Sequence, residues 1–344
     1  MGGSCGPAKA YAMSLGFLLL QFAIGAALIG VAGAVLSRCA EQLGQAYGWG
    51  RGWVGLALLA TVTSMPELAS GVSAVAWVDA PDLAIGDALG SCVFNLVFLV
   101  AVDALQRGQP IYREAAATHM LTAAFGVVML GFVTMSLLLA SHSPRLLHIG
   151  LYSPLMLGLY LFALASVKRH ERAAVPASPA GAATRAQIRR AWQRFAAAAL
   201  VVLAAGTWLP LVADQLAVRT GLGRSFVGTL WLAFATSLPE IAVTLAALRL
   251  RALDLAIGNL LGSNLFNVAV LALDDAAYLR GPLLADASPV HAATAVTAMT
   301  MTGLVMIGLA MRPQGRVLRV ASWVSVGLLA AYLLNAVLLY LHDT

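Results

Sequence analysis

Apolar residues fill most of the chain in long runs that short polar segments interrupt. Runs long enough to cross a ~30 Å hydrocarbon core as one helix lie near residues 13–36, 53–78, 83–105, 115–140, 147–167, 195–216, 225–248, 253–273, 289–311 and 317–341. The pattern predicts ten membrane-spanning helices, five in each half of the 344 residues. It is weakest around residues 137–152.

The composition agrees with a membrane protein. The chain is 60% hydrophobic and 10% charged, with a mean hydropathy of +0.85, whereas a soluble domain has about 25% charged residues. Residues 1–9 lack the features of a secretory signal, and the apolar stretch after them is long, so we expect a retained span. The predicted fold class is an all-α polytopic membrane protein.

The basic residues predict how the helices are oriented. If the N-terminus lies outside, cytoplasmic loops hold 16 of the 21 Lys and Arg residues, and the opposite loops hold five. This distribution fits the positive-inside rule and predicts that both termini lie outside the cytoplasm. The net charge of +6 is thereby explained by topology, and no nucleic-acid partner is expected.

The two halves are expected to be inverted repeats. Residues 1–168 form the first half, 169–190 a flexible cytoplasmic linker rich in Ala, Pro, Gly and Arg, and 191–344 the second half. Because five spans is an odd number, the second half enters the membrane from the opposite side. Such inverted symmetry is typical of alternating-access transporters, and we expect one chain to suffice as a monomer.

Two sequence blocks occur twice at an offset of about half the chain. Residues 48–67 and 221–240 match at 11 of 20 positions and end in Thr-Ser-Met-Pro-Glu and Thr-Ser-Leu-Pro-Glu. Residues 82–95 and 254–267 match at 10 of 14 positions. The duplication indicates a two-fold repeat transporter.

The first block places an acid inside a predicted span. Glu67 and Glu240 lie near the middle of spans 53–78 and 225–248, where a carboxylate costs at least ~2.5–3.5 kcal/mol. No Lys or Arg lies near the middle of any predicted span. The acids therefore need a cation, or else a proton and a hydrogen bond from a neighbouring helix.

A proline precedes each acid. Pro66 and Pro239 remove the helical partner of the carbonyl four residues earlier, and free carbonyls at membrane depth are tolerated only beside protein or a cavity. Hydroxyl groups flank the same position in both copies. Carboxylate, carbonyl and hydroxyl oxygens are the ligands that hard cations such as Ca²⁺ prefer.

The second block can add ligands from a second helix. Ser91 and Asn95 are four residues apart on one helical face, as are Ser263 and Asn267. The Gly-x-x-x-Gly spacing in the same block allows close helix packing. Four helices, two from each half, would then converge on one oxygen-rich site.

These motifs resemble the α-repeats of the sodium/calcium exchanger family (cation/Ca²⁺ antiporters), in its prokaryotic form. The resemblance spans essentially the whole chain and implies exchange of Ca²⁺ for Na⁺ or H⁺ by alternating access, without a cofactor. By this resemblance Glu67 and Glu240 are the central chelating acids, and Ala60 and Ala233 are the backbone-carbonyl ligands. The remaining ligand positions implied by the family are Thr63, Ser64, Thr236, Ser237, Ser91, Asn95, Ser263 and Asn267.

The chain departs from this family at several positions. Some relatives have Asp where Asn267 stands, so one acid is missing. Asp87 and Cys92 replace the asparagines that the second repeat keeps as Asn259 and Asn264. Asp87 is expected either to attract cations at the outer side or to be a solvated interfacial acid. Asp103 and its repeat equivalent Asp275 lie at helix ends, where we expect them to be solvated.

The leading hypothesis is a Ca²⁺/Na⁺ antiporter with inorganic cations and the lipid bilayer as its only partners. An H⁺-coupled divalent-cation antiporter is the main alternative, and an ion channel is a further one. An intramembrane enzyme is disfavoured, because His119, His148 and His291 do not combine with the repeated motifs at metal-ligand spacing. Three scattered cysteines predict neither a disulfide framework nor a zinc site.

Overall fold

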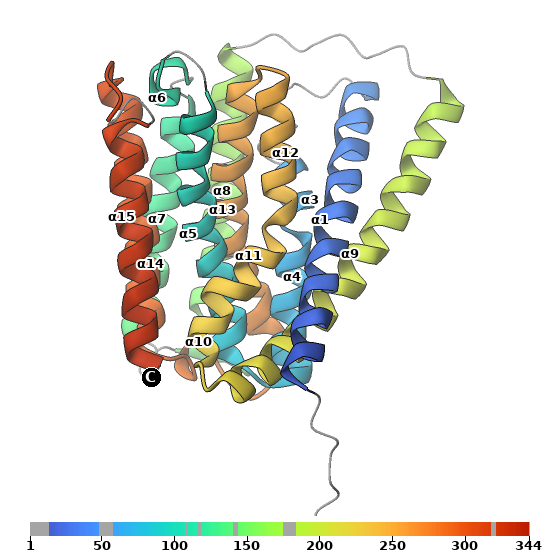
Figure 1. Cartoon of the computed structure of the whole chain (residues 1–344), viewed down its shortest axis with the longest axis vertical. Helices are drawn as coiled ribbons and strands as arrows, with labels where there is room; N and C mark the ends of the chain where they lie inside the picture. The colour runs from blue at the N-terminus through green and yellow to red at the C-terminus, as the bar shows by residue number, and fades with distance from the viewer. Residues whose placement is uncertain are drawn as a thin grey trace, which may run out of the picture.

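The computed structural model describes residues 14–47, 58–106, 109–115, 118–139, 144–174, 184–317 and 321–343. Helices make up nearly all of it, with one two-stranded hairpin (Figure 1). The first half contains α1 (Leu15–Ala46), α3 (Ala60–Thr63), α4 (Met65–Ser73), the π-helix η2 (Ala74–Val78), α5 (Pro81–Leu105), α6 (Ile111–Glu114), α7 (Thr118–Leu138), β1 (Arg145–Leu146), β2 (Ile149–Gly150) and α8 (Tyr152–Ala174). The second half contains α9 (Arg185–Thr220), α10 (Arg224–Phe226), the π-helix η4 (Val227–Leu232), α11 (Ala233–Thr236), α12 (Leu238–Arg249), α13 (Leu253–Ala277), the 3₁₀ helix η5 (Leu283–Ala285), α14 (Val290–Met311) and α15 (Trp323–Asp343).

The long helices are suited to a membrane. Among the described residues, seven helices are long and apolar enough to cross a bilayer: α1, α5, α7, α9, α13, α14 and α15. The helical segments from Arg224 to Thr236 and from Leu238 to Arg249 meet at a 44° bend and make an eighth if the pair is one span. The segment from α3 to η2 and helix α8 occupy the two other predicted spans. The all-α polytopic fold class is confirmed, and the count of ten spans stays a prediction.

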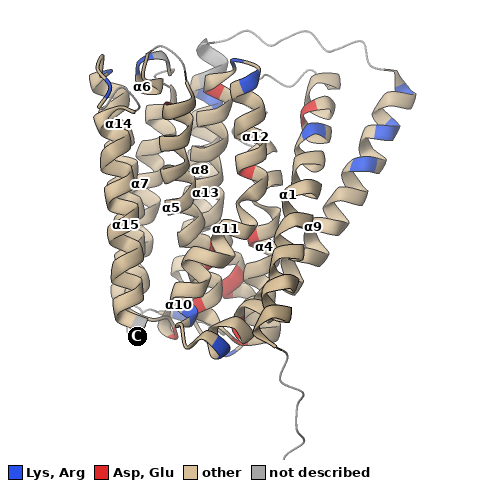
Figure 2. Cartoon of the chain, in the orientation of Figure 1, with Lys and Arg blue, Asp and Glu red and all other residues tan. Residues whose placement is uncertain are grey.

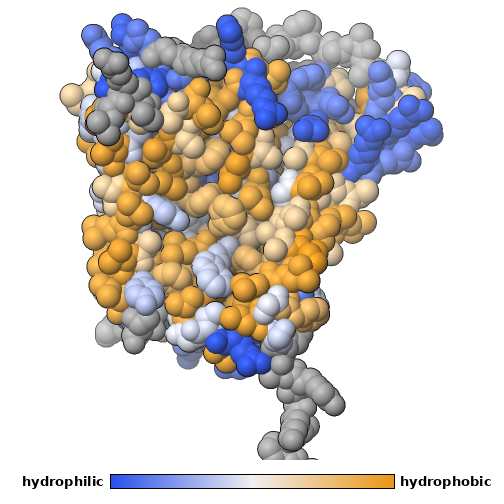
Figure 3. All heavy atoms as spheres, viewed as in Figure 1, coloured by the Kyte–Doolittle hydropathy of each residue, from blue (hydrophilic) through white to orange (hydrophobic). Residues whose placement is uncertain are grey.

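The two halves run in opposite directions. In Figure 1, α1 begins at the lower end of the molecule, whereas α9, the first helix of the second half, begins at the upper end. Lys and Arg gather mostly at the upper end (Figure 2), and an apolar belt separates the polar ends (Figure 3). The described C-terminal helix ends at the lower end, the end at which α1 begins.

Helices α5 and α13 form the centre of the bundle. The most apolar window of α13 is 94% buried within the molecule, whereas those of α1 and α15 are only 28% buried. The outer helices therefore present apolar side chains such as Leu20, Val31 and Leu338 to the lipid. A buried pair of central helices can carry polar side chains that lipid would not tolerate.

Some helices begin or end away from the predicted boundaries. Helix α8 continues to Ala174 and α9 begins at Arg185, so both extend into the stretch predicted as a linker over residues 169–190. A capping box explains why α9 begins at this point. The side chains of Thr184 and Gln187 each accept a hydrogen bond from the other residue's backbone N–H. The last helix begins at Trp323 rather than at residue 317. Residues 48–57 of the first repeated block and residues 175–183 of the linker lie outside the described residues.

Two glycines let α5 approach the second half closely. A Cβ atom on Gly86 would lie 2.9 Å from Thr229 N, and a Cβ on Gly90 would lie 2.7 Å from Thr229 Cα, both in the backbone of η4. The equivalent contact is looser in the other repeat, where a Cβ on Gly258 would lie 3.4 Å from the His119 ring. Gly86 and Gly90 therefore pack α5 against the backbone of η4, whereas Gly258, the repeat equivalent of Gly86, faces a side chain.

We predict that Gly90→Ala destabilises the protein while Gly258→Ala does not. The added methyl group would collide with immobile η4 backbone, and overpacking of this kind costs about 1–3 kcal/mol. Thermal unfolding of the purified protein in detergent measures the difference. Equal melting temperatures for Gly90→Ala and the unmodified protein would contradict the packing described.

Candidate functional site

Two broken helices place the repeated acids at equivalent positions. Helix α3 ends at Thr63 and α4 begins at Met65, while α11 ends at Thr236 and α12 begins at Leu238. The following proline stands in the first turn of the new helix in each copy, where its missing N–H is tolerated. Glu67 and Glu240 also lie in those first turns, and the positive ends of the helix dipoles favour a carboxylate there.

Each acid accepts a hydrogen bond from the other half of the chain. Ser64 Oγ donates to Glu240 Oε1 at 2.8 Å, and Ser237 Oγ, its repeat equivalent, donates to Glu67 Oε1 at 3.2 Å. Ser91 Oγ also donates to Glu67 Oε1, at 3.3 Å. These hydrogen bonds between the halves bring the two broken helices together at one centre.

The second carboxylate oxygen of each acid has no hydrogen-bond partner. Glu67 Oε2 and Glu240 Oε2 are both buried and unpartnered, with side chains 1% and 0% exposed. The ion pairs formed by the described residues include neither acid. Buried carboxylate oxygens of this kind are free to bind a cation or a proton.

The other predicted ligands are buried around the acids, but they do not all face them. Thr63 Oγ1 and Ser263 Oγ lie 3.2 Å apart across the two halves, and Thr236 Oγ1 donates to Asp87 Oδ1 at 2.8 Å. The carbonyl of Ala60 accepts from Thr63 Oγ1 at 3.3 Å. Ala233 makes the same contact with Thr236. Both carbonyls are therefore engaged within their own helix.

The two asparagines predicted as ligands differ in their surroundings. Asn95 Nδ2 donates to Asn264 Oδ1 at 3.1 Å, and Asn264 Nδ2 donates to the Cys92 carbonyl at 3.1 Å. These contacts join α5 to α13 where the two helices cross. Asn267 is fully buried and neither of its amide atoms has a partner. The hydrogen bond of Asn95 thus engages only its amide nitrogen, whereas both amide atoms of Asn267 are buried without a partner.

Two acids expected at solvated positions, Asp103 and Asp275, are buried instead. Asp103 accepts hydrogen bonds from the N–H groups of Ile111 and Ser322 and from Ser325 Oγ. Asp275 accepts from Gly150 N, Tyr152 Oη, Ser153 Oγ and Leu283 N. These two repeat-related acids anchor the loops that follow their helices. Asp87, which is 1% exposed, is not a solvated interfacial acid either.

Sequence reasoning missed two further side-chain contacts between the halves. His119 Nε2 lies 3.0 Å from Asp254 Oδ1, and His291 Nε2 lies 3.0 Å from Asp82 Oδ1. Both residues of each pair have their equivalent in the other pair at an offset of 172 residues. The offset itself was the signal, since it relates the two histidines as it relates the repeated blocks. Each pair ties the start of one central helix to the opposite half.

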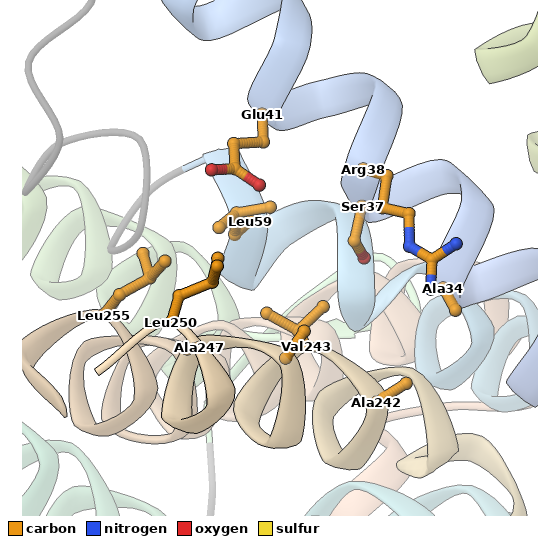
Figure 4. A pocket seen from close by; sticks show the side chains of 11 residues that line it. Ala34, Ser37, Arg38, Glu41, Leu59, Ala242, Val243, Ala247, Leu250 and Leu255 are labelled. Atoms are coloured by element: carbon orange, nitrogen blue, oxygen red, sulfur yellow. The ribbon is translucent and has the colours of Figure 1, made fainter. Parts of the chain in front are cut away.

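One pocket is lined mostly by small and apolar side chains (Figure 4). It lies between α1 and α12, with Arg38 and Glu41 on one wall and Val243 and Leu250 on the other. Its lining includes Leu59, which directly precedes Ala60, and Val243 follows Glu240 by about one helical turn. The pocket is therefore lined by residues that are close in sequence to both halves of the central site.

The fold and site define an all-helical polytopic membrane protein whose two inverted halves share a buried carboxylate centre. The chain matches the sodium/calcium exchanger protein family over residues 17–167 and again over 190–341. It belongs to that family. Family membership makes it an integral membrane protein of a transporter class rather than an enzyme.

Individual relatives agree with this assignment. CaxA of Alkalimonas amylolytica, a proposed antiporter, is 30% identical over 226 residues, which are 62% of this chain. The inner membrane protein YrbG of Escherichia coli (strain K12) is 25% identical over 228 residues, which are 63% of this chain. Each match spans 66% of the length of the relative.

A solved structure shows the same fold. The sodium-calcium exchanger NCX_Mj, soaked with Na⁺ and Sr²⁺, superposes with a TM-score of 0.63 at 20% sequence identity. The superposition covers 94% of this chain and 99% of NCX_Mj. At this level of identity the likeness concerns the fold alone.

Proposed function

We propose that the chain is a secondary antiporter that exchanges Ca²⁺ for Na⁺ across a bacterial inner membrane. The observation that carries this proposal is the pair of buried, unpartnered oxygens, Glu67 Oε2 and Glu240 Oε2, contributed by opposite halves. Two carboxylates neutralise one Ca²⁺ or two Na⁺, and hard oxygen ligands suit both ions. No cofactor is needed, and the ions are the cargo.

The remaining ligands follow from the same centre. We assign Ser64, Ser237, Ser91, Thr63, Ser263 and Thr236 as hydroxyl ligands, Asn95 and Asn267 as amide ligands, and Ala60 and Ala233 as carbonyl ligands. Binding an ion requires some of them to exchange their present hydrogen bonds for the ion. Asn267 supplies a neutral oxygen where some relatives have an acid, so the negative charge of this site comes from the two glutamates.

Exchange then follows from competition for the same two carboxylates. An empty centre leaves two negative charges buried, which disfavours a change of conformation until Ca²⁺ or Na⁺ neutralises them. The inverted halves supply two equivalent arrangements, one open to each side. The pocket beside Val243 is the cytoplasmic route in this proposal, because Arg38 lines it and basic residues mark the cytoplasmic side. Both termini then lie outside.

One chain is sufficient for this mechanism. Both acids, and the serines that bond them, come from the same chain. We therefore propose that the monomer is the functional unit, with the lipid bilayer and inorganic cations as its partners.

We predict that Glu67→Gln or Glu240→Gln lowers Ca²⁺ transport to background. Each substitution preserves size and hydrogen bonding but removes one of the two charges that hold the cation. Asp286→Asn is the matched control, since Asp286 is an exposed acid bonded to Tyr278. Uptake of ⁴⁵Ca²⁺ into proteoliposomes measures the effect. Full transport by either glutamine variant would overturn the assigned centre.

The coupling ion is tested in the same proteoliposomes. We expect an imposed Na⁺ gradient to drive ⁴⁵Ca²⁺ uptake and an imposed pH gradient alone to leave it at background. Uptake driven by the pH gradient alone would instead establish H⁺ coupling. Uptake with neither gradient would indicate a channel and refute antiport.

A further inference from the structure

Asp274 is a buried acid that the central site does not use. It lies near the end of α13, is 0% exposed, and neither of its carboxylate oxygens has a hydrogen-bond partner. Its neighbour Asp275 accepts hydrogen bonds from four groups. Asp275 is thus a structural anchor, whereas Asp274 has no structural role that would explain a buried charge.

The carboxylate of Asp274 lies against the helix that carries Glu67. A Cβ atom on Gly71 of α4 would lie only 2.7 Å from Asp274 Cγ and would overlap both carboxylate oxygens. Gly71 is four residues after Glu67, about one helical turn farther along α4. The absence of a side chain at Gly71 therefore leaves the space that the carboxylate occupies.

Two more oxygen-bearing side chains lie at this level. Asp87 of α5 lies within electrostatic range of Asp274, and its Oδ2 is buried without a partner. Ser70 of α4 lies beside Asp87 without reaching hydrogen-bond geometry, and its hydroxyl is likewise buried and unpartnered. Helices α4, α5 and α13 pack against one another. Three helices thus bring unpartnered oxygens to one region.

This region lies between the central acids and the end of the molecule that carries the termini. Asp87 is one turn before Ser91 on α5, and Asp274 is two turns after Asn267 on α13. Helix α5 begins at that end and α13 ends there (Figure 1). Both acids therefore lie farther toward the termini than the ligands on the same helices.

The inverted repeat has no such acids on the opposite side. The positions equivalent to Asp87, Asp274 and Ser70 are Asn259, Val102 and Val243. One amide and two apolar side chains cannot supply the same charge. The extra pair of acids is therefore specific to one route through the protein, and is not a requirement of the fold.

We propose that Asp87, Asp274 and Ser70 form a second divalent-cation site on the route between the central glutamates and the face that carries the termini. Two carboxylates match the charge of one Ca²⁺, and the hydroxyl and water molecules supply further oxygen ligands. The cation removes the cost of two buried charges that have no other counter-ion. The choice of Ca²⁺ as the probe rests on the proposed function. The site holds Ca²⁺ that has left the central glutamates or is about to reach them.

Equilibrium binding of ⁴⁵Ca²⁺ to the purified full chain in detergent tests this proposal. We expect two Ca²⁺ per chain in the unmodified protein and one in the Glu67→Gln/Glu240→Gln double variant. In that background Asp274→Asn should weaken the residual binding about tenfold or more, because the charge count of a Ca²⁺ site sets its affinity. Asp274→Asn alone should leave one tight Ca²⁺ per chain.

Stability separates a binding role from a structural one. In Ca²⁺-free buffer Asp274→Asn should melt at or above the temperature of the unmodified protein, because it removes an unpartnered buried charge. The matched control, Asp275→Asn, should melt at a lower temperature and still bind two Ca²⁺. A lower melting temperature for Asp274→Asn, with two Ca²⁺ still bound, would overturn the second site.

The outcomes distinguish this site from the central one. If the Glu67→Gln/Glu240→Gln variant binds no Ca²⁺ while the unmodified protein binds one, the second site is refuted and the proposed function stands. If residual binding in that variant is unaffected by Asp274→Asn, the assignment of the second site is refuted. If the unmodified protein binds no Ca²⁺, both proposals fail.

Discussion

The cost of burying a carboxylate without a counter-charge is the constraint on which the rest of this structure depends. Glu67 and Glu240 each keep one oxygen unpartnered inside the bundle, and no ion pair of the described residues reaches them. Hydrogen bonds from Ser64 and Ser237 satisfy only the other oxygen. The same unpartnered oxygen occurs at equivalent positions in both halves, so the centre presents two buried acceptors for a cation or a proton.

Hydrogen bonds between the two halves of the fold hold that centre together. The serine beside each helix break bonds the acid of the opposite half, and each repeat-related histidine pairs with an aspartate of the opposite half. These contacts hold the central helices together by polar interactions, which lipid alone cannot provide. They are also arranged in equivalent pairs, so that each half makes the same contacts to the other.

Much of this could be predicted from the sequence, because the informative features are local or repeated. Apolar runs predicted the helices, and each proline before a glutamate marked the helix break. The offset between blocks predicted that the acids are equivalent. Burial of Asp103 and Asp275 could not be predicted, because their place at helix ends says nothing of the loops that fold over them. Burial of Asp87 depends on its contact with Thr236 in the other half of the chain. The free oxygens of Asp274 depend on the space at Gly71, a contact between residues 203 positions apart in the chain.

The most direct test is the position of a bound divalent cation. Anomalous diffraction from crystals of the protein soaked in Sr²⁺, a heavier analogue of Ca²⁺, locates the ion without reference to transport. The account predicts an anomalous peak in contact with both Glu67 and Glu240, and loss of that peak in the Glu240→Gln variant. Well-ordered crystals that show no Sr²⁺ within coordination distance of either glutamate would contradict it.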